Sequence, residues 1–410
     1  MKPKRKTFDF ILMLPPLLLA GFGIVMVYSA SMVTSYLEGE PAYELMLKQA
    51  MWFVIGLAGF LFACFFNYKF YHKLTKWIVL LLIISLFAVL LFGATVNNAK
   101  SWIYIGSFSI QPSEFVKIGI IIYLASVYTK KQEQEYIGDF FKGVLPPLII
   151  TSLLVGLVVL QPDIGTGAII FAIACSVIFS SGIKFRHLFV LISIGFAVLI
   201  ALGIHMLTDE KISRFTGAYQ PFADPDHGGY QLIQSYIAIA TGGISGSGIG
   251  QGIQKLGYLT QAESDFIMAV IAEELGLFGV LFVVVNIAII VLRGLFIAKQ
   301  CENRFGALIA IGISSMFAIQ SIINLGAISG LLPITGVPLP FVSYGGTSLV
   351  VSLFSVGILN NIARHVNYNR NLKELTTEEE KQPSANPFKT KNKRKIAQST
   401  RRINTKKARP

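Results

Sequence analysis

Charged side chains are scarce in this sequence: Asp, Glu, Lys and Arg make up 14% of its 410 residues, whereas 53% are hydrophobic. A soluble protein of this size carries about 25% charged residues, so the composition excludes an ordinary soluble domain. Apolar runs long enough to cross a lipid bilayer recur from Phe8 to Ile362. In lipid, a helix satisfies its backbone polar groups within one segment. The sequence therefore predicts an all-α polytopic membrane protein.

Cysteine and histidine are also few, with three and five residues respectively. Cys64, Cys175 and Cys301 lie in or beside apolar segments and show no paired spacing. The histidines show no metal-ligand spacing. Neither a disulfide framework nor a zinc site follows from these patterns, and no metal ligand is assigned.

Acidic residues are absent from the end of the chain, where Lys381–Pro410 contains eleven Lys or Arg. Most of the net charge of +13 therefore lies in one segment. Such a polar tail has nothing to bury, so we expect residues 366–410 to be disordered and cytoplasmic, near anionic lipid head groups. Membrane lipids are favoured over nucleic acid as its partner. Residues 1–7 form a short basic cytoplasmic start before a membrane domain at 8–365.

The apolar runs divide into ten candidate membrane helices. The first resembles a signal peptide, with Ser29-Ala30-Ser31 as a small-residue site, but it is too long and further spans follow. The ten ranges are Phe8–Met32, Gln49–Phe66, Trp77–Phe92, Pro112–Tyr128, Val144–Leu160, Ile164–Ser181, Leu188–Leu207, Asp265–Leu292, Phe305–Ile328 and Ser343–Ile362.

Basic residues alternate between the loops of this pattern, gathering after spans two, four, six and eight. Since Lys and Arg favour the cytoplasmic side, both termini are expected inside the cell. The outer loop Thr208–Ser264, between spans seven and eight, is too long for an ordinary connection and too apolar for disorder. Its stretch Gly242–Gly252 is interpreted as a tight turn against the bundle, or as backbone that approaches a phosphate. We expect this loop to be functional.

The stretch Tyr258–Gly276 places three carboxylates at the start of the eighth span. A charge within a membrane helix costs roughly 2.5–3.5 kcal/mol on insertion scales, so each acid needs a reason. Asp265 falls in the expected first turn, where the helix dipole eases burial of an anion. It is either functional or an N-terminal cap. For Glu273 and Glu274 we favour a structural role that holds neighbouring helices together.

Polar residues also collect at other outer helix ends. Glu114 and Lys117 lie three residues apart in span four and share a helix face, so they can pair, either within a site or only to neutralise each other. Gln161 and Asp163 lie between spans five and six. The segment Gly330–Ser348 is rich in Pro and Gly, and irregular backbone at membrane depth is tolerated only inside protein or along a water-filled cavity. Together these elements predict a cavity that opens outwards.

Several of these stretches occur together, in this order, in one known family. They are NNAKSWIYIGSFSIQPSEFVK (Asn97–Lys117), QPDIGT (Gln161–Thr166), ESDFIMAVIAEELG (Glu263–Gly276) and LLPITGVPLPFVSYGGTS (Leu331–Ser348). Over about residues 8–365 the chain resembles the SEDS family of shape, elongation, division and sporulation proteins. The resemblance implies a ten-span enzyme that polymerises lipid II, the undecaprenyl-diphosphate-linked disaccharide peptide, into peptidoglycan. It also implies a class B penicillin-binding protein, a transpeptidase, as partner.

The resemblance also suggests site residues. The essential loop acid of the family falls on Asp265. The candidates for substrate binding are Trp102, Glu114, Lys117, Gln161, Asp163, Arg214 and Ser343.

The chemistry gives these residue types a reason. Glycosyl transfer needs a base for the proton of the acceptor sugar hydroxyl, and Asp265 is the candidate. The diphosphate leaves readily and needs positive charge, so the acid pair of a glycosidase is not required. Lys117 and Arg214 are candidates for that charge, and a divalent cation, Mg²⁺ or Mn²⁺, could share it. Trp102 either packs on a sugar ring or anchors its segment at the membrane interface.

A transporter that flips the lipid-linked precursor is the alternative from another functional class. It should show internal repeats and midplane polar residues that reach both faces, whereas the polar residues here crowd the outer face. Within the family, the AKSW form of the first motif and the basic tail favour the division branch over elongation or sporulation. We therefore expect a polymerase of the bacterial cytoplasmic membrane, acting at the division septum with other division proteins.

Overall fold

The computed structural model describes residues 8–96, 99–106, 108–184, 216–226 and 228–381, with a few single positions between 185 and 195. Within the described residues, Phe8–Arg364 forms one compact unit, and the chain from His365 onward belongs to a second. The architecture below is that of Phe8–Arg364.

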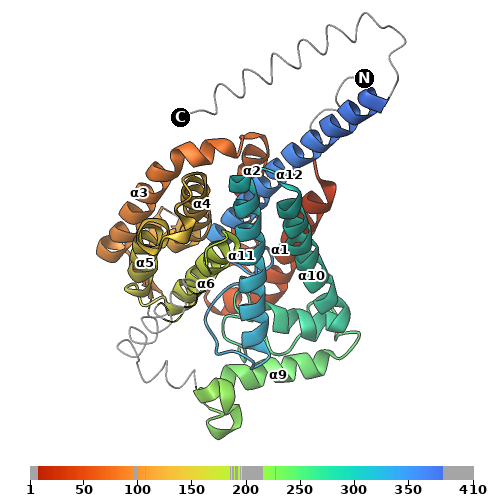
Figure 1. Cartoon of the computed structure of the whole chain (residues 1–410). Coiled ribbons are helices and arrows are strands. Elements are labelled where there is room, and N and C mark those ends of the chain that lie inside the picture. Colours follow the sequence, from red (N-terminus) through yellow and green to blue (C-terminus); the bar gives the residue numbers. More distant parts are fainter. Residues whose placement is uncertain are drawn as a thin grey trace, which may run out of the picture. The chain divides into compact units, whose positions relative to one another are not determined.

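Helices dominate the described residues (Figure 1). The α-helices are α1 (Phe10–Leu37), α2 (Glu44–Phe65), α3 (Lys69–Phe92), α4 (Pro112–Glu133), α5 (Leu145–Val159), α6 (Ile164–Ser180), α9 (Tyr230–Gly242), α10 (Ile267–Gln300), α11 (Arg304–Ile328) and α12 (Gly346–Lys381). Three short turns, η1 (Tyr136–Gly138), η2 (Phe140–Val144) and η3 (Pro221–Ala223), complete the helical elements.

Seven helical segments of the described chain are long and apolar enough to cross a membrane, and α6 is a shorter apolar helix. The seven are α1, α2, α3, η2 with α5, α10, α11, and α12 as far as Glu374. This confirms the all-α polytopic class. In position, the expected spans coincide with α1–α6 and α10–α12, although α4 is not among the seven segments apolar enough to cross a membrane. The seventh expected span, Leu188–Leu207, lies almost entirely outside the described residues.

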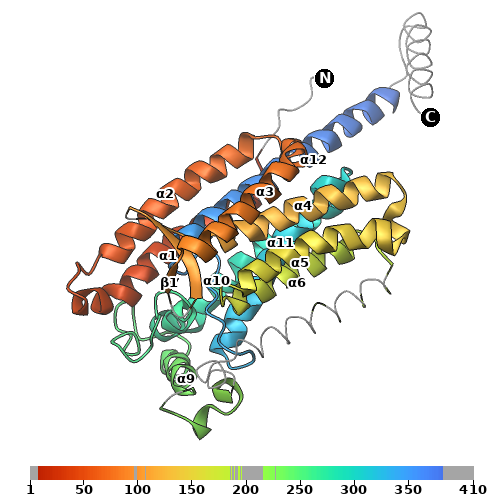
Figure 2. The ribbon, with the colours of Figure 1, turned by 90° about the vertical axis from the view of Figure 1, so that its left-hand side faces the viewer.

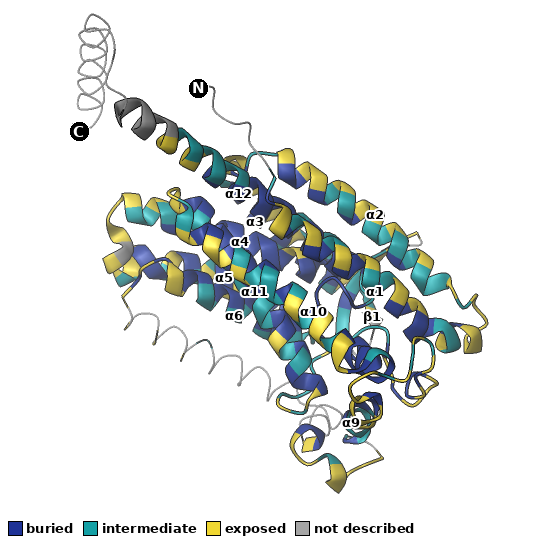
Figure 3. Cartoon of the chain, turned by 90° about the vertical axis from the view of Figure 1, so that its right-hand side faces the viewer, coloured by how far each residue is buried: buried dark blue, intermediate teal, exposed yellow. Residues whose placement is uncertain are grey.

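The bundle has an outer layer that faces lipid and an inner layer that is buried. On α2 and α3, side chains such as Phe62 and Leu81 are exposed, as expected for helices that meet lipid tails. By contrast, α4 is buried along most of its length and packs against α3, α6 and α11 (Figures 2 and 3). Polar residues at the start of α4 are therefore enclosed by protein, which places them where a site can be built.

A small antiparallel sheet between α3 and α4 was not expected from the sequence. Its strands are β1 (Ala94–Val96), β2 (Ala99–Ile105) and β3 (Phe108–Ile110), in the order β1-β2-β3. Trp102 pairs with Ala94, and Ile103 with Ile110. The sheet is tied to the start of α12, because Thr347 Oγ1 donates to Ser109 O at 3.2 Å.

The eighth expected span, Asp265–Leu292, differs from the observed structure. The helix begins at Ile267, so Asp265 precedes it instead of lying in its first turn. The backbone also leaves helical geometry at Gly276, with φ 61° and ψ −154°, so α10 consists of two helical pieces. Only glycine adopts this conformation easily, and a Cβ here would lie 2.5 Å from Gly246 N and Ile244 O. The long loop therefore inserts against the break.

Helix α9 lies crosswise at the ends of α10 and α11 (Figure 1). Ser235 Oγ of α9 donates to Ile328 O, the last residue of α11, at 2.9 Å. The amphipathic stretch from Tyr230 thus packs on the bundle. At the other end of the chain, α12 continues to Lys381, beyond residue 366, where the tail was expected to begin.

Candidate active site

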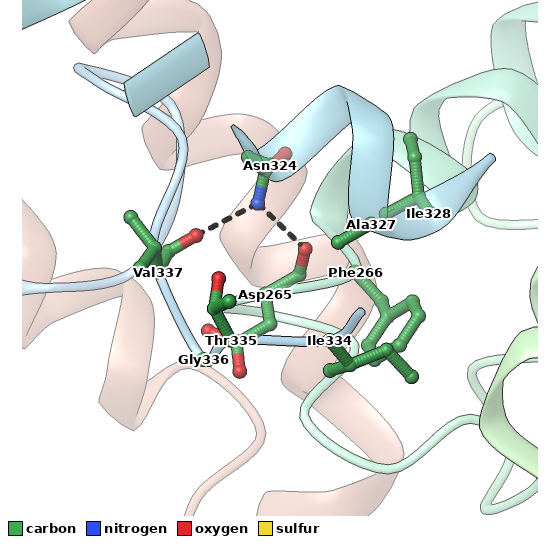
Figure 4. A pocket seen from close by; sticks show the side chains of 9 residues that line it. All are labelled: Asp265, Phe266, Asn324, Ala327, Ile328, Ile334, Thr335, Gly336 and Val337. Atoms are coloured by element: carbon green, nitrogen blue, oxygen red, sulfur yellow. Dashed lines mark hydrogen bonds between the residues drawn. The ribbon is translucent and has the colours of Figure 1, made fainter. Parts of the chain in front are cut away.

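Asp265 opens onto a small pocket between two non-helical segments, the residues just before α10 and the loop between α11 and α12 (Figure 4). Its side chain is half-buried. The pocket is lined by Asp265, Phe266, Asn324, Ala327, Ile328, Ile334, Thr335, Gly336 and Val337. A carboxylate in this place is held by protein on two sides and remains partly exposed.

The carboxylate lies against the backbone of Gly336. A Cβ at this glycine would stand 3.5 Å from Asp265 Oδ2, and its φ of +69° is unfavourable for other residues. Thr335 and Asp265 point to the same side of the pocket in Figure 4. Thr335 Oγ1 is buried and has no hydrogen-bond partner among the described residues, so a hydroxyl is available beside the acid.

Ser343 supports the chain just before Asp265. Its Oγ donates to Ser264 O at 2.6 Å and accepts from Leu339 N at 2.8 Å. Gln49 of α2 holds the same turn, because its Nε2 donates to Ser343 O at 3.1 Å. The Ser343 hydroxyl is thus engaged within the protein, and its contribution to the site passes through Ser264.

Glu114 and Lys117 form the ion pair that their spacing predicts. Lys117 Nζ lies 2.8 Å from Glu114 Oε1 and 2.7 Å from Oε2, and both side chains are buried. The helix that carries them begins at Pro112, which needs no N–H partner in the first turn. The pair neutralises itself in this state, while the lysine remains a source of positive charge inside the bundle.

Asp163 lies near this pair, at the start of α6. Its Oδ1 accepts from Thr166 N at 3.1 Å, and its Oδ2 accepts from Gln111 Nε2 at 3.2 Å. The pKa of Asp163 is raised above its usual value, chiefly because the side chain is buried. The hydrogen bonds from Thr166 oppose this effect, and the nearby charges of Glu114 and Lys117 raise and lower the pKa by smaller amounts. Three of the predicted residues therefore share one electrostatic environment.

Gln161 belongs to the same turn. Its Nε2 donates to Leu86 O of α3 at 3.2 Å, and its Oε1 is buried without a hydrogen-bond partner among the described residues. A buried amide oxygen without a partner is costly, so this acceptor is available for a ligand or water.

The start of α6 also reaches the Asp265 pocket. A Cβ at Gly165 would lie 2.5 Å from Thr335 O, so the two backbones touch. Thr335 in turn lines the pocket with Asp265. The structure thus brings the Glu114, Lys117 and Asp163 group and the Asp265 pocket onto adjoining segments.

Two predicted site residues are not joined to this arrangement. Trp102 lies half-buried in β2, and its described contacts are those of the small sheet. Arg214 lies outside the described residues. Their assignment to the substrate site stays a prediction.

Lys255 was not among the residues predicted from the sequence, and it is fully buried in the long loop. Its Nζ lies 2.5 Å from Glu274 Oε1 and donates to Ser29 Oγ of α1 at 2.8 Å. Glu273 Oε1 accepts from the backbone N of Ile253 at 2.7 Å. Glu274 of α10 also accepts from Ser29 Oγ of α1 at 2.8 Å, so it joins two neighbouring helices as favoured, whereas Glu273 binds the long loop. A single Lys in an apolar, Gly-rich stretch was the available signal, since it needs a buried partner.

Metal binding has no protein cluster in the described part of the chain, where no group of three His, Cys, Asp or Glu could hold an ion.

Known proteins resemble the chain over nearly its whole length. A family model described as cell cycle protein, covering FtsW, RodA and SpoVE, matches residues 10–368. The probable peptidoglycan glycosyltransferase FtsW of Bacillus subtilis (strain 168) is 46% identical over 384 residues, 91% of this chain and 95% of that protein. Stage V sporulation protein E of the same strain is 36% identical over 370 residues, 90% of this chain and 100% of that protein.

The fold also matches a solved structure that concerns "structural coordination of polymerization and crosslinking by a peptidoglycan synthase complex". The TM-score is 0.70 and the identity 26%, over 88% of this chain and 98% of that chain. The likeness therefore covers the described helices as a set and extends beyond single motifs.

Proposed function

The chain belongs to the cell cycle protein family of FtsW, RodA and SpoVE, and we propose that it polymerises lipid II into peptidoglycan for the division septum. The activity rests on its relatives, which are named peptidoglycan glycosyltransferases, and the division role on the greater identity to FtsW than to the sporulation protein. The observation that carries the chemistry is Asp265, a half-exposed carboxylate at a pocket whose segments adjoin those of the buried Glu114–Lys117 pair.

Asp265 acts as the general base in this proposal. Its carboxylate takes the proton from the acceptor sugar hydroxyl while that oxygen bonds to the anomeric carbon of the donor. The bond from that carbon to the diphosphate breaks, and the lipid diphosphate leaves with the electron pair. The non-helical segments on both sides of Asp265 leave room for a hydroxyl to approach, which a mid-helix acid would not offer.

Positive charge for the diphosphate comes from Lys117, and from Arg214 by family resemblance. The ammonium of Lys117 is already desolvated, so it need not lose further water to bind a phosphate oxygen, which would share it with Glu114. Mg²⁺ or Mn²⁺, where it takes part, is held mainly by the diphosphate. Lys117→Ala should weaken both lipid II binding and the polymerisation rate; unchanged binding by the folded variant would remove Lys117 from this role.

A class B penicillin-binding protein is the partner we propose. The solved relative is part of a complex that coordinates polymerisation with crosslinking. In this chain, α9 and the long loop pack on α10 and α11, so a transpeptidase that contacts these helices can shift the segment that carries Asp265. The enzyme lies in the cytoplasmic membrane, with both termini inside and the Asp265 pocket outside.

Polymerisation by the purified protein tests the proposal. Lipid II is incubated with the protein alone and with its transpeptidase partner, and glycan strands are measured by gel electrophoresis. We expect polymer in the complex and less from the protein alone. The flippase alternative predicts transfer of lipid II between leaflets without polymer, so vesicle flipping is measured on the same preparations. If the complex with an active transpeptidase makes no polymer, the proposal that this protein is a polymerase is wrong.

A further inference from the structure

Asn324 joins the two segments that form the Asp265 pocket. It lies near the end of α11 with a buried side chain, and its Nδ2 donates to Asp265 O and to Val337 O, each at 2.9 Å (Figure 4). One carbonyl precedes α10 and the other belongs to the loop between α11 and α12. A single amide group thus spans both walls of the pocket.

The orientation of this amide is set by its partners. If the group were flipped, Oδ1 would face two carbonyl oxygens and both contacts would become repulsive. Asn324 Oδ1 accepts no hydrogen bond within the described residues. The side chain therefore acts through its two N–H groups. Both donate to carbonyl groups of non-helical backbone, which have no helical hydrogen bond.

We propose that Asn324 is a positioning residue that sets the place of the Asp265 carboxylate against Gly336. Asp265 and Gly336 lie on the two segments that the amide connects, and Oδ2 stands 3.5 Å from a Cβ at Gly336. Without the amide, the two segments separate and the carboxylate loses its place near the acceptor hydroxyl. Misplacement by about 1 Å can cost on the order of 100-fold in rate. The inference rests on Asp265 being the base of the proposed polymerase.

The same helix offers a matched control. Ser314 is also buried in α11, but its Oγ donates to Ala310 O of its own helix at 2.8 Å. Ser314→Ala therefore removes one buried hydrogen bond from α11 without touching either wall of the pocket. Any loss of rate that Asn324→Ala shows and Ser314→Ala does not is then specific to the connection.

Steady-state polymerisation of lipid II by the complex separates positioning from folding. We expect Asn324→Ala to lower kcat by about 10- to 100-fold, with lipid II binding by the folded protein within about threefold of normal, and Ser314→Ala to match the wild type. Rates and lipid II binding are both normalised to the folded fraction, which is measured separately by size-exclusion chromatography in detergent. Combined with Asp265→Asn, Asn324→Ala should add no further loss, because it acts only through that carboxylate.

Asn324→Asp gives a second readout. A protonated carboxyl can donate one hydrogen bond, whereas an ionised one can donate none. The rate of Asn324→Asp relative to Asn324→Ala should therefore rise as the pH falls, which a merely structural role would not produce.

Normal polymerisation by folded Asn324→Ala would overturn the inference and leave the proposed polymerase activity intact. The same holds if Asn324→Ala slows the Asp265→Asn variant by the same factor by which it slows the wild type. Loss of lipid II binding in step with the rate would overturn it too. No polymer from the wild-type complex would instead overturn the proposed function and this inference together.

Discussion

The stretch from Asp265 to Glu274 carries three acids that differ in burial and in their partners. Glu273 and Glu274 are 1% and 0% exposed, and each is bound to the long loop through Lys255 or backbone N–H groups. Asp265 is half-buried and lines an open pocket. All three lie in one sequence motif, so the motif alone does not separate a reactive acid from two structural ones.

The difference lies in what completes each carboxylate. Desolvation of an anion is expensive, and Glu274 offsets it with an ammonium and a hydroxyl, Glu273 with backbone donors. These acids have no room for a substrate. Asp265 lies where two irregular segments meet, so part of its hydration shell can be replaced by a ligand. A functional acid in this bundle is thus marked by incomplete enclosure more than by membrane depth.

The largest effect should come from Asp265→Asn. The amide keeps the size of the side chain but is no longer a base, so polymerisation should fall by about 10²- to 10⁴-fold. Thermal unfolding and lipid II binding should change little, because the side chain is half-exposed and the diphosphate is held elsewhere. Near-normal polymerisation by the folded variant would show that Asp265 is not a catalytic carboxylate and does not differ in this respect from Glu273 and Glu274.

Breaking the Glu274 pair should act on stability instead. Glu274→Gln leaves Lys255 as an uncompensated buried charge, and such a loss costs about 3–5 kcal/mol. The midpoint of thermal unfolding in detergent should drop clearly, while each folded molecule keeps far more activity than Asp265→Asn. Lys255→Met with Glu274→Gln should be less destabilised than either single variant. If the losses simply add, the pair is not coupled.

Glu273→Gln should have a smaller effect on the same measurement. Gln keeps an acceptor oxygen for the N–H groups of Ile253 and Gln254, which bond to Glu273 at 2.7 and 3.2 Å, but it lacks the charge. Hydrogen bonds to charged groups exceed neutral ones by roughly 1 kcal/mol, which is the expected loss of stability. A loss as large as that of Glu274→Gln would show that the two acids are equally critical to the loop.

Much of the fold could be predicted because hydropathy and the positions of basic loops determine where helices cross a bilayer. The Glu114–Lys117 pair was also predictable, since i,i+3 spacing fixes a shared face. The break at Gly276 was not, because it depends on contacts with Ile244 and Gly246 from the long loop. Local sequence shows a glycine, but not the backbone that fills the space beside it.

In the candidate site, too, some residues could be predicted from local sequence, whereas others depend on contacts between distant segments. Asp265 was identified by an acid beside an apolar run and by family motifs. Asn324 gave no signal, because its bond to Asp265 joins residues 59 apart and an isolated Asn in an apolar helix has many explanations. Lys255 and Glu274, 19 residues apart, form a pair that only the inserted loop creates. Contacts between irregular segments carry the information that periodicity lacks.

Glu263, two residues before Asp265, gives the smallest and most direct test of enclosure. Burial raises the pKa of its carboxyl, against its own backbone hydrogen bond, and Glu38 raises it slightly further. The folded state therefore binds this proton more tightly than the unfolded state. Stability from this group is fully present below the unfolded pKa, about 4.3, and is lost as the pH rises through the folded value.

Glu263→Gln removes that titration, so its unfolding midpoint should fall less than that of the wild type as the pH rises from about 4 to neutrality. Thermal unfolding in detergent across this range measures the difference, with Glu302→Gln as control, because Glu302 is an exposed acid just beyond the far end of α10. A steeper decline in Glu263→Gln would mean that the ionised form is stabilised. The degree of burial would then not distinguish the functional acid Asp265 from the acids around it. Only the hydrogen-bond or ion-pair partner of each carboxylate would distinguish them.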